Sequence, residues 1–362
     1  MNRIVLIVIL YLLTLLAAVI LPNGISDYNA YVQLLTCIVY MLFIKSFDVY
    51  LSTFICWFPI CLVSISHALL YTFIDCALIF FIFGSLFIGL HFSVKKRELR
   101  FFEIVFFLIY LASIVGILNP FLYRDTGDGM RYMGLFHAIN FSASVFSILG
   151  IAVWEIEKTA KRRTWILFVL IAGLLIYIWA TTTRSLLFAL PYWIYQLSQR
   201  FNKKILFIFI VVVCVFYLPT IVKTILPKLR FEEDESSMVT RSVLYLKLLS
   251  DIADNYAIIP QGSNAATTMI VGFTGDPRFS PHNDFLNYIY NWGVVFYIFC
   301  AMIIRQMKGN IKFNLEFYLI LLAIAACALH NMMFATYVWM PFVIILMVRR
   351  CGSMKKIQYG QK

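Results

Sequence analysis

The sequence predicts an all-α fold, a polytopic transmembrane helical bundle of about 12 spans. Of its 362 residues, 62% are hydrophobic and only 13% are charged, whereas soluble domains carry about 25% charged residues. The apolar residues form long continuous runs, unlike the short alternating strands of a membrane β-barrel. The same apolar excess excludes a disordered chain. We therefore expect a helical membrane protein with one domain, residues 1–362.

Twelve apolar runs are candidate spans, at about 20 residues per span. The first follows a single basic residue and lacks a small-x-small cleavage site, so we expect an uncleaved anchor. The eighth is short and carries Pro191, which is expected to kink it. The predicted spans are Ile4–Leu21, Ala30–Ile44, Val49–Ile65, Ala68–Leu90, Phe101–Leu118, Ile139–Val153, Trp165–Ala180, Leu186–Leu197, Ile205–Val222, Phe285–Ile304, Phe317–Ala328 and Ala335–Val348.

The distribution of basic residues orients the bundle. Twelve spans place both termini on one side of the membrane, and 21 of the 30 Lys and Arg residues fall on that side, against nine on the other. Because positive residues accumulate on the cytoplasmic side, both termini are predicted to be cytoplasmic. The basic residues form short clusters rather than one patch, which argues against a nucleic-acid partner. Membrane lipid remains the expected partner of the chain.

The eight cysteines indicate neither a disulfide framework nor a zinc site. Seven lie within apolar runs, the eighth lies in the basic tail, and none forms a CxxC pair. The sequence also lacks HExxH, DxD and a glycine-rich phosphate loop. We therefore expect no metal and no cofactor.

Two outward segments are longer than simple turns, Asn119–Ala138 and the large loop Lys223–Asp284. Long polar loops concentrate function, so we expect the chemistry on the outer face. Within the large loop, the acidic run Glu232–Glu235 is interpreted as a solvated loop tip.

Arg184 is the clearest candidate for function among the outward basic residues. The positive-inside rule makes arginine and lysine unfavourable on the outer side, so each one there calls for an explanation. It ends the hydroxyl-rich turn Thr181–Thr183 and precedes Ser185. A planar guanidinium among hydroxyl donors can bind two phosphate oxygens at once. The alternative is an interfacial arginine that reaches lipid headgroups.

Arg241 begins a segment in which Leu244, Leu248 and Ile252 recur at a spacing of four residues. This period predicts an amphipathic helix on the membrane surface or across the mouth of the bundle. Arg241 would lie in its first turn, where free amides favour anions, and the alternative is an ordinary surface charge. Further on, Ile258–Gly262 predict a turn that brings the loop back.

His282 follows a proline at the outer start of the tenth span, where Asn283 or Asp284 can cap the helix. The helix dipole disfavours a proton on His282 and keeps the imidazole neutral, as a general base requires. Gly293, eleven residues on, returns to the same helical stripe and would let a neighbouring helix approach. The alternative is a capping or interfacial histidine.

Asp75 is the most deeply placed acid, within the fourth span. Carboxylates inside a membrane are candidates for function, but one acid without a matching base does not define a proton relay. The other histidines, His67, His91, His137 and His330, lie near the ends of spans.

In type and order, these elements resemble the O-antigen ligase and polymerase superfamily, bacterial integral membrane glycosyltransferases that act on undecaprenyl-diphosphate-linked glycans. The shared parts cover most of the chain: the twelve-span layout, the turn before Arg184, the large loop with Arg241 and a Pro-x-Gly turn, and His-Asn followed by nine residues and glycine. An Arg-x-x-Gly segment leading into a span with asparagine adds Arg131, Gly134 and Asn140.

The resemblance implies a metal-independent, inverting glycosyl transfer at the periplasmic face of the bacterial inner membrane. By resemblance to the family, Arg184 and Arg241 would bind the leaving diphosphate, and His282 would deprotonate the attacking sugar hydroxyl. Arg131 and Asn283 are the further candidate substrate-binding residues.

Within the superfamily the sequence favours the O-antigen polymerase, which joins lipid-linked repeat units into a longer chain. The alternative, a ligase, transfers the glycan to the phosphorylated lipid A core and should need more than nine outward cations. A flippase or transporter would predict repeated halves, and no repeat is present. Polymerases of this family commonly work with a chain-length regulator protein, a candidate partner beside the lipid-linked repeat units. The sequence departs from the family in one place: the family's His-Asn motif usually ends in Gly, Thr or Tyr three residues after its glycine, where this chain has Phe296.

Overall fold

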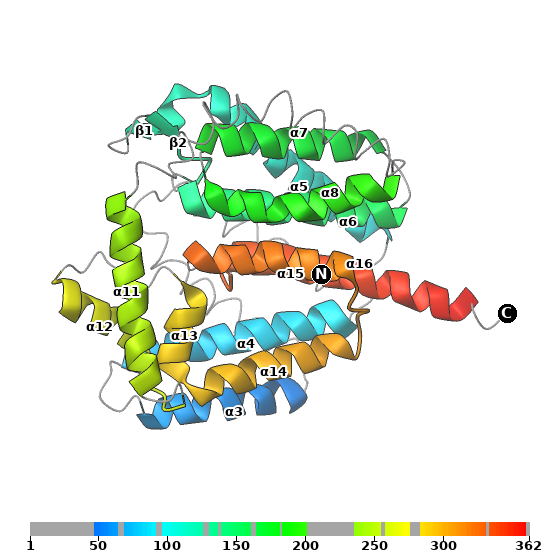
Figure 1. The fold of residues 1–362 in the computed structure, drawn as a ribbon. Coiled ribbons are helices and arrows are strands. Elements are labelled where there is room, and N and C mark those ends of the chain that lie inside the picture. Colours follow the sequence, from blue (N-terminus) through cyan, green and yellow to red (C-terminus); the bar gives the residue numbers. More distant parts are fainter. Residues whose placement is uncertain are drawn as a thin grey trace.

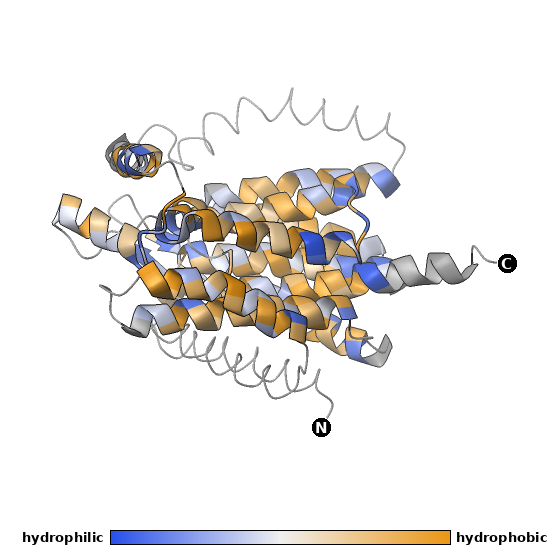
Figure 2. Ribbon diagram, turned by 90° about the horizontal axis from the view of Figure 1, so that it is seen from below, coloured by the Kyte–Doolittle hydropathy of each residue, from blue (hydrophilic) through white to orange (hydrophobic). Residues whose placement is uncertain are grey.

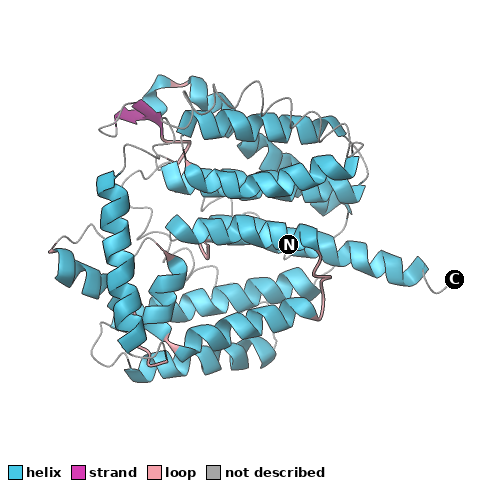
Figure 3. Ribbon diagram, viewed as in Figure 1, coloured by secondary structure: helices cyan, strands magenta, loops and turns pink. Residues whose placement is uncertain are grey.

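A computed structural model of the chain describes residues 47–63, 69–91, 96–125, 130–136, 139–160, 164–181, 183–200, 235–254, 258–275, 283–330 and 333–359. This part of the chain is helical apart from one β-hairpin (Figure 3). The all-α class is therefore confirmed in its coarse form. The predicted spans Ile4–Leu21, Ala30–Ile44 and Ile205–Val222 lie outside the described residues.

The long helices lie side by side in a bundle, and their ends gather at two opposite ends of it (Figure 1). Within the described part of the chain, four helical stretches are long and apolar enough to cross a membrane: Tyr71–His91, Glu98–Leu118, Ile139–Thr159 and Thr164–Thr181. These stretches support a membrane protein. The helices of the bundle are α3 (Phe47–Val63), α4 (Leu69–His91), α5 (Lys96–Val115), α6 (Ile139–Ala160), α7 (Thr164–Thr181), α8 (Leu190–Arg200), α14 (Val294–Lys308), α15 (Leu315–Cys327) and α16 (Thr336–Tyr359).

The core of the bundle lies around α6 and α16, which pack against each other. Every residue of α6 from Phe141 to Glu157 is buried, as is every residue of α16 from Tyr337 to Val348. On α5, by contrast, Ile104, Leu108 and Val115 are exposed, as expected of a helix with one face toward lipid. Figure 2 shows apolar residues along the middle of the bundle and polar residues toward both ends.

One end of the bundle carries irregular and short elements, and we call it the hairpin end (Figure 1). The hairpin itself pairs its two strands antiparallel, with Arg124 opposite Arg131. The elements of the hairpin end are β1 (Tyr123–Asp125), β2 (Met130–Tyr132), α11 (Glu235–Asp254), α12 (Ala265–Thr274) and α13 (Asp284–Trp292). The 3-10 helices η2 (Gly116–Leu118), η3 (Pro120–Leu122) and η6 (Ala328–His330) link neighbouring elements.

Two predicted spans differ from the structure. The eighth contains the 3-10 helix η4 (Arg184–Ala189) followed by α8. Pro191 is the second residue of α8, just after the junction with η4, where a missing N–H costs no helical hydrogen bond. The tenth span is interrupted at Gly293, which separates α13 from α14.

Candidate functional site

Arg131 lies on β2 at the hairpin end, and its neighbour Tyr132 fixes that strand to the bundle. The Tyr132 ring is fully buried and packs edge-on against Tyr177 of α7, with ring centroids 5.6 Å apart. Its hydroxyl donates to the carbonyl oxygen of Ser113 at 2.7 Å. Because side chains alternate along a strand, Arg131 points away from this anchor and is half-buried.

Gly134 explains the Arg-x-x-Gly spacing in physical terms. Its φ of +77° lies in the left-handed region that glycine adopts without strain. A Cβ there would lie 2.2 Å from the Cβ of Ser142 and 2.7 Å from the Tyr177 hydroxyl. Only glycine therefore fits where the chain turns from β2 into α6, and Asn140 follows, half-buried, in the first turn of α6.

Arg184 begins η4, directly after the end of α7. The hydroxyl of Thr181 donates to the Tyr177 carbonyl oxygen at 2.7 Å. Thr183 is 6% exposed, and its hydroxyl has no hydrogen-bond partner within the described part of the chain. The backbone thus places Arg184 where α7 passes into η4, and its side chain lies outside the described residues.

The amphipathic helix predicted around Arg241 is confirmed as α11, which runs across the hairpin end of the bundle (Figure 1). Leu244 and Leu248 are buried against Ala266 and Ile270 of α12. The helix begins at Glu235 rather than at Arg241. Arg241 therefore lies in the second turn, and the prediction that first-turn amides assist it was wrong. Its side chain lies outside the described residues.

Asn283 caps α13, as the sequence predicted. Its side-chain oxygen accepts hydrogen bonds from the amides of Phe285 at 3.0 Å and Leu286 at 3.2 Å. His282 lies outside the described residues, next to this cap. Asp284 does not cap the helix, because its carboxylate accepts from the amide of Met333 at 2.8 Å.

Asp284 is 3% exposed. Burial raises the pKa of its carboxyl group to about 7. This aspartate thus holds α13 against the segment before α16.

Gly293 joins α13 to α14, so it does not lie on a continuous helical stripe with His282 as the sequence suggested. Its φ is +50°, and an added Cβ would lie 2.4 Å from the Ile258 carbonyl oxygen. The close approach is made by the backbone of residues 258–264, which we call the return loop. The turn predicted at Ile258–Gly262 falls within this loop, and its backbone packs on this joint.

The return loop is hydrogen-bonded to the last turn of α13. The amide of Gly262 donates to the carbonyl oxygen of Asn291 at 3.0 Å, and the amide of Val294 donates to that of Ile258 at 2.8 Å. The side-chain oxygen of Asn291 also accepts from the amide of Ala266 at 2.8 Å. Loop, α12 and α13 thus form one connected unit, on which α11 packs.

The structure therefore brings to one end of the bundle the segments that carry the predicted site. These are β2 with Arg131, α11 with the backbone of Arg241, and the start of α13 with Asn283 (Figure 1). The turn before Arg184 follows α7, which contacts β2. Among the described residues no cluster of three or more His, Cys, Asp or Glu side chains could hold a metal ion.

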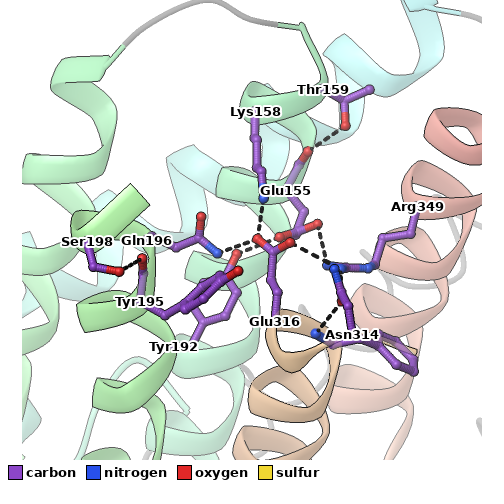
Figure 4. A network of polar contacts seen from close by, with 11 residues as sticks. Glu155, Lys158, Thr159, Tyr192, Tyr195, Gln196, Ser198, Asn314, Glu316 and Arg349 are labelled. Carbon is purple, nitrogen blue, oxygen red and sulfur yellow. Dashed lines mark hydrogen bonds and ion pairs between the residues drawn. The ribbon is translucent and has the colours of Figure 1, made fainter. Parts of the chain in front are cut away.

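Sequence reasoning missed a second polar cluster, at the end of the bundle opposite the hairpin, which we call the charged end (Figure 4). Arg349 of α16 donates to Glu155 of α6 at 3.1 Å and to Glu316 of α15 at 3.2 Å. Glu316 also pairs with Lys158 and accepts from Gln196. Charged residues next to the ends of apolar runs were the available signal, because Glu155, Glu316 and Arg349 all lie at such ends.

No protein-family model, curated protein or solved structure matches the chain. Its function is therefore inferred from its own residues.

Proposed function

We propose that the protein is an O-antigen polymerase, a membrane glycosyltransferase that joins undecaprenyl-diphosphate-linked repeat units into a longer polysaccharide. One observation carries the proposal. The segments that bear the family-like motif are far apart in the sequence, yet β2, α11 and the start of α13 lie together at the hairpin end (Figure 1). A lipid-linked donor presents its diphosphate at a membrane surface, which is where the ends of apolar helices lie.

The proposed reaction is a direct displacement at the anomeric carbon of the donor sugar. An acceptor sugar hydroxyl forms the new glycosidic bond while the bond to the diphosphate breaks, which inverts the configuration. Arg184 and Arg241 bind and neutralise the diphosphate as its charge develops. His282 takes the proton of the attacking hydroxyl, and Arg131 and Asn283 contact the sugars or the donor. No metal takes part, because guanidinium groups supply the positive charge.

The amphipathic character of α11 supports this arrangement. Its apolar face is held by α12 and α13, with Leu244 3% and Leu248 0% exposed. Its other face leaves Leu246 and Leu249 exposed, as suits a helix at the boundary between lipid and water. A helix placed in this way can hold Arg241 at the level of a lipid headgroup.

In this proposal the hairpin end faces the periplasm, and both termini are cytoplasmic in the bacterial inner membrane. Single cysteines placed in residues 223–284 of a cysteine-free variant should react with a membrane-impermeant thiol reagent in cells whose outer membrane alone is permeable. Labelling only after the inner membrane is broken would reject the orientation.

A gene deletion separates the polymerase from the ligase. Cells that lack a polymerase should carry lipid A core capped with single repeat units. Cells that lack a ligase should carry bare core while lipid-linked chains accumulate. Purified protein supplied with lipid-linked repeat units should make longer chains by itself, and lipid A core as an obligatory acceptor would favour the ligase.

A further inference from the structure

We infer that Asp75 is a positioning residue, which fixes α13 and its cap Asn283, the residue that follows the proposed base His282 in the sequence; the inference rests on the proposed function. Asp75 lies in α4, far from every motif residue in the sequence. Its carboxylate accepts a hydrogen bond at 3.0 Å from the indole Nε1–H of Trp292, the last residue of α13. The side chain of Ser263 in the return loop lies beside the same carboxylate.

The two partners of Asp75 have no access to water. Trp292 and Ser263 are both 0% exposed. A buried donor that loses its acceptor cannot be solvated in exchange. Asp75 therefore connects α4 to two elements at once, the end of α13 and the return loop.

These contacts fix α13 at both of its ends. At the C-terminal end, Asp75 holds Trp292, and the return loop bonds to the backbone of the last turn. At the N-terminal end, Asp284 holds the amide of Met333. Asn283, the N-cap of α13 and the residue after His282, therefore belongs to a short helix that is held at both ends.

The same short helix also supports α11. Leu286 and Tyr290 of α13 pack against the cluster that contains Leu244 and Leu248 of α11. A shift of α13 would therefore move the helix that bears Arg241 together with the cap next to His282. Because a displacement of about 1 Å at a reacting centre can cost about a hundredfold in rate, a fixed α13 matters for catalysis.

The test compares three variants of the purified full-length protein. Asp75→Leu removes the acceptor of the Trp292 indole and the polar neighbour of Ser263, whereas Asp75→Asn retains an acceptor for Trp292 and a polar group beside Ser263. The matched control is Ser85→Ala, also in α4. Ser85 accepts a hydrogen bond from the indole Nε1–H of Trp339 at 2.7 Å. This variant therefore also deprives a buried tryptophan of its acceptor, but that tryptophan belongs to α16 instead of α13.

Two measurements are made on each variant. Amide hydrogen exchange without substrate reports on the anchor, because local opening sets the exchange rate. Asp75→Leu should speed exchange in residues 258–294 about tenfold or more, while Asp75→Asn and Ser85→Ala leave those residues near wild type. Turnover with lipid-linked repeat units should fall about tenfold to a hundredfold in Asp75→Leu, with a KM for the donor within about threefold of wild type.

Several results would overturn the inference. Unchanged exchange in Asp75→Leu would show that Asp75 anchors nothing. Faster exchange with normal turnover would show that the anchor does not serve catalysis. Equal loss of turnover in Asp75→Asn would indicate that the charge itself is needed. A wild-type protein that makes no polymer, with the exchange effect intact, would instead reject the proposed function.

Discussion

The two ends of the bundle hold their polar groups in opposite ways. At the charged end, Arg349, Glu155 and Glu316 are each at most 10% exposed and bind one another directly. At the hairpin end, the described contacts run mainly between backbone and single side chains, as in the return loop, Tyr132 and Asp284. The first arrangement satisfies charge with charge, and the second fixes the positions of segments.

This difference indicates a different role for each end. A buried ion pair that is fully hydrogen-bonded offers little to a ligand, so the charged end ties α6, α15 and α16 together. Asn314 also belongs to this cluster. Its side-chain oxygen caps α15 by accepting from the amide of Phe317 at 3.0 Å, and it accepts from Arg349 at 2.9 Å. The hairpin end instead holds short elements in fixed places, as a site for a large lipid-linked substrate needs.

The largest expected effect concerns the proposed base, His282, which precedes Asn283 in the sequence. His282→Ala should reduce turnover about two to four orders of magnitude, because that is the usual contribution of a general base. Binding of the lipid-linked donor should remain, since the arginines hold the diphosphate independently. Both quantities are measured on purified protein with lipid-linked repeat units. Wild-type turnover would exclude His282 as the base, and loss of folding would point to a capping role.

The next effect is a loss of stability at the charged end. Arg349→Met leaves Glu155 and Glu316 buried without their shared cation, which should cost about 3–5 kcal/mol in free energy of unfolding. The free energy is measured by denaturant unfolding in detergent, and turnover of the folded protein should be unchanged.

Lys158→Met is the matched control for that change. Its side chain is 37% exposed, so its loss should cost about 1 kcal/mol or less. Equal costs for Lys158→Met and Arg349→Met would show that the charged end is not organised around Arg349. A fall in turnover of the folded Arg349→Met protein would show that the two ends are not separate in function.

The diphosphate clamp gives a smaller but specific effect. Arg184→Lys and Arg241→Lys keep the charge but lose the two-pronged geometry, so turnover should fall about tenfold to a hundredfold, the value of one or two charged hydrogen bonds. Arg124→Lys is the control, since Arg124 is exposed on β1 opposite Arg131. Normal polymer from both clamp variants, at normal expression, would remove the bidentate clamp from the proposal.

The sequence predicted the class of fold because long continuous apolar runs can cross a membrane in few ways other than as helices. It also predicted α11, whose period of four matches the buried residues Leu244 and Leu248, and the cap at Asn283. It could not predict the break at Gly293, because glycine is common within membrane helices and only the approach of the return loop requires a positive φ there.

Pairings across the chain were also beyond the sequence. Asp75 appeared as a single acid without a base, because its partner Trp292 and its neighbour Ser263 are over 180 residues away. Glu155 and Arg349 lie near the ends of apolar runs, and nothing in the sequence marks them as a pair. In each case a local pattern showed the residue, and only the packing of helices showed its partner.

The smallest effect concerns the glycine that turns the hairpin into α6. Gly134→Ala should lower the free energy of unfolding by about 1–3 kcal/mol, because a side chain at a φ of +77° is strained and its Cβ would overlap Ser142. Gly272→Ala is the control, since no described heavy atom lies within 4 Å of its added Cβ and alanine favours a helix interior by about 1 kcal/mol. Unfolding in detergent should separate the two glycines by sign, Gly134→Ala destabilising and Gly272→Ala neutral or stabilising. Equal behaviour of the two variants would mean that the hairpin end is free to rearrange, and that Arg131 is not held in the fixed place on which the comparison of the two ends depends.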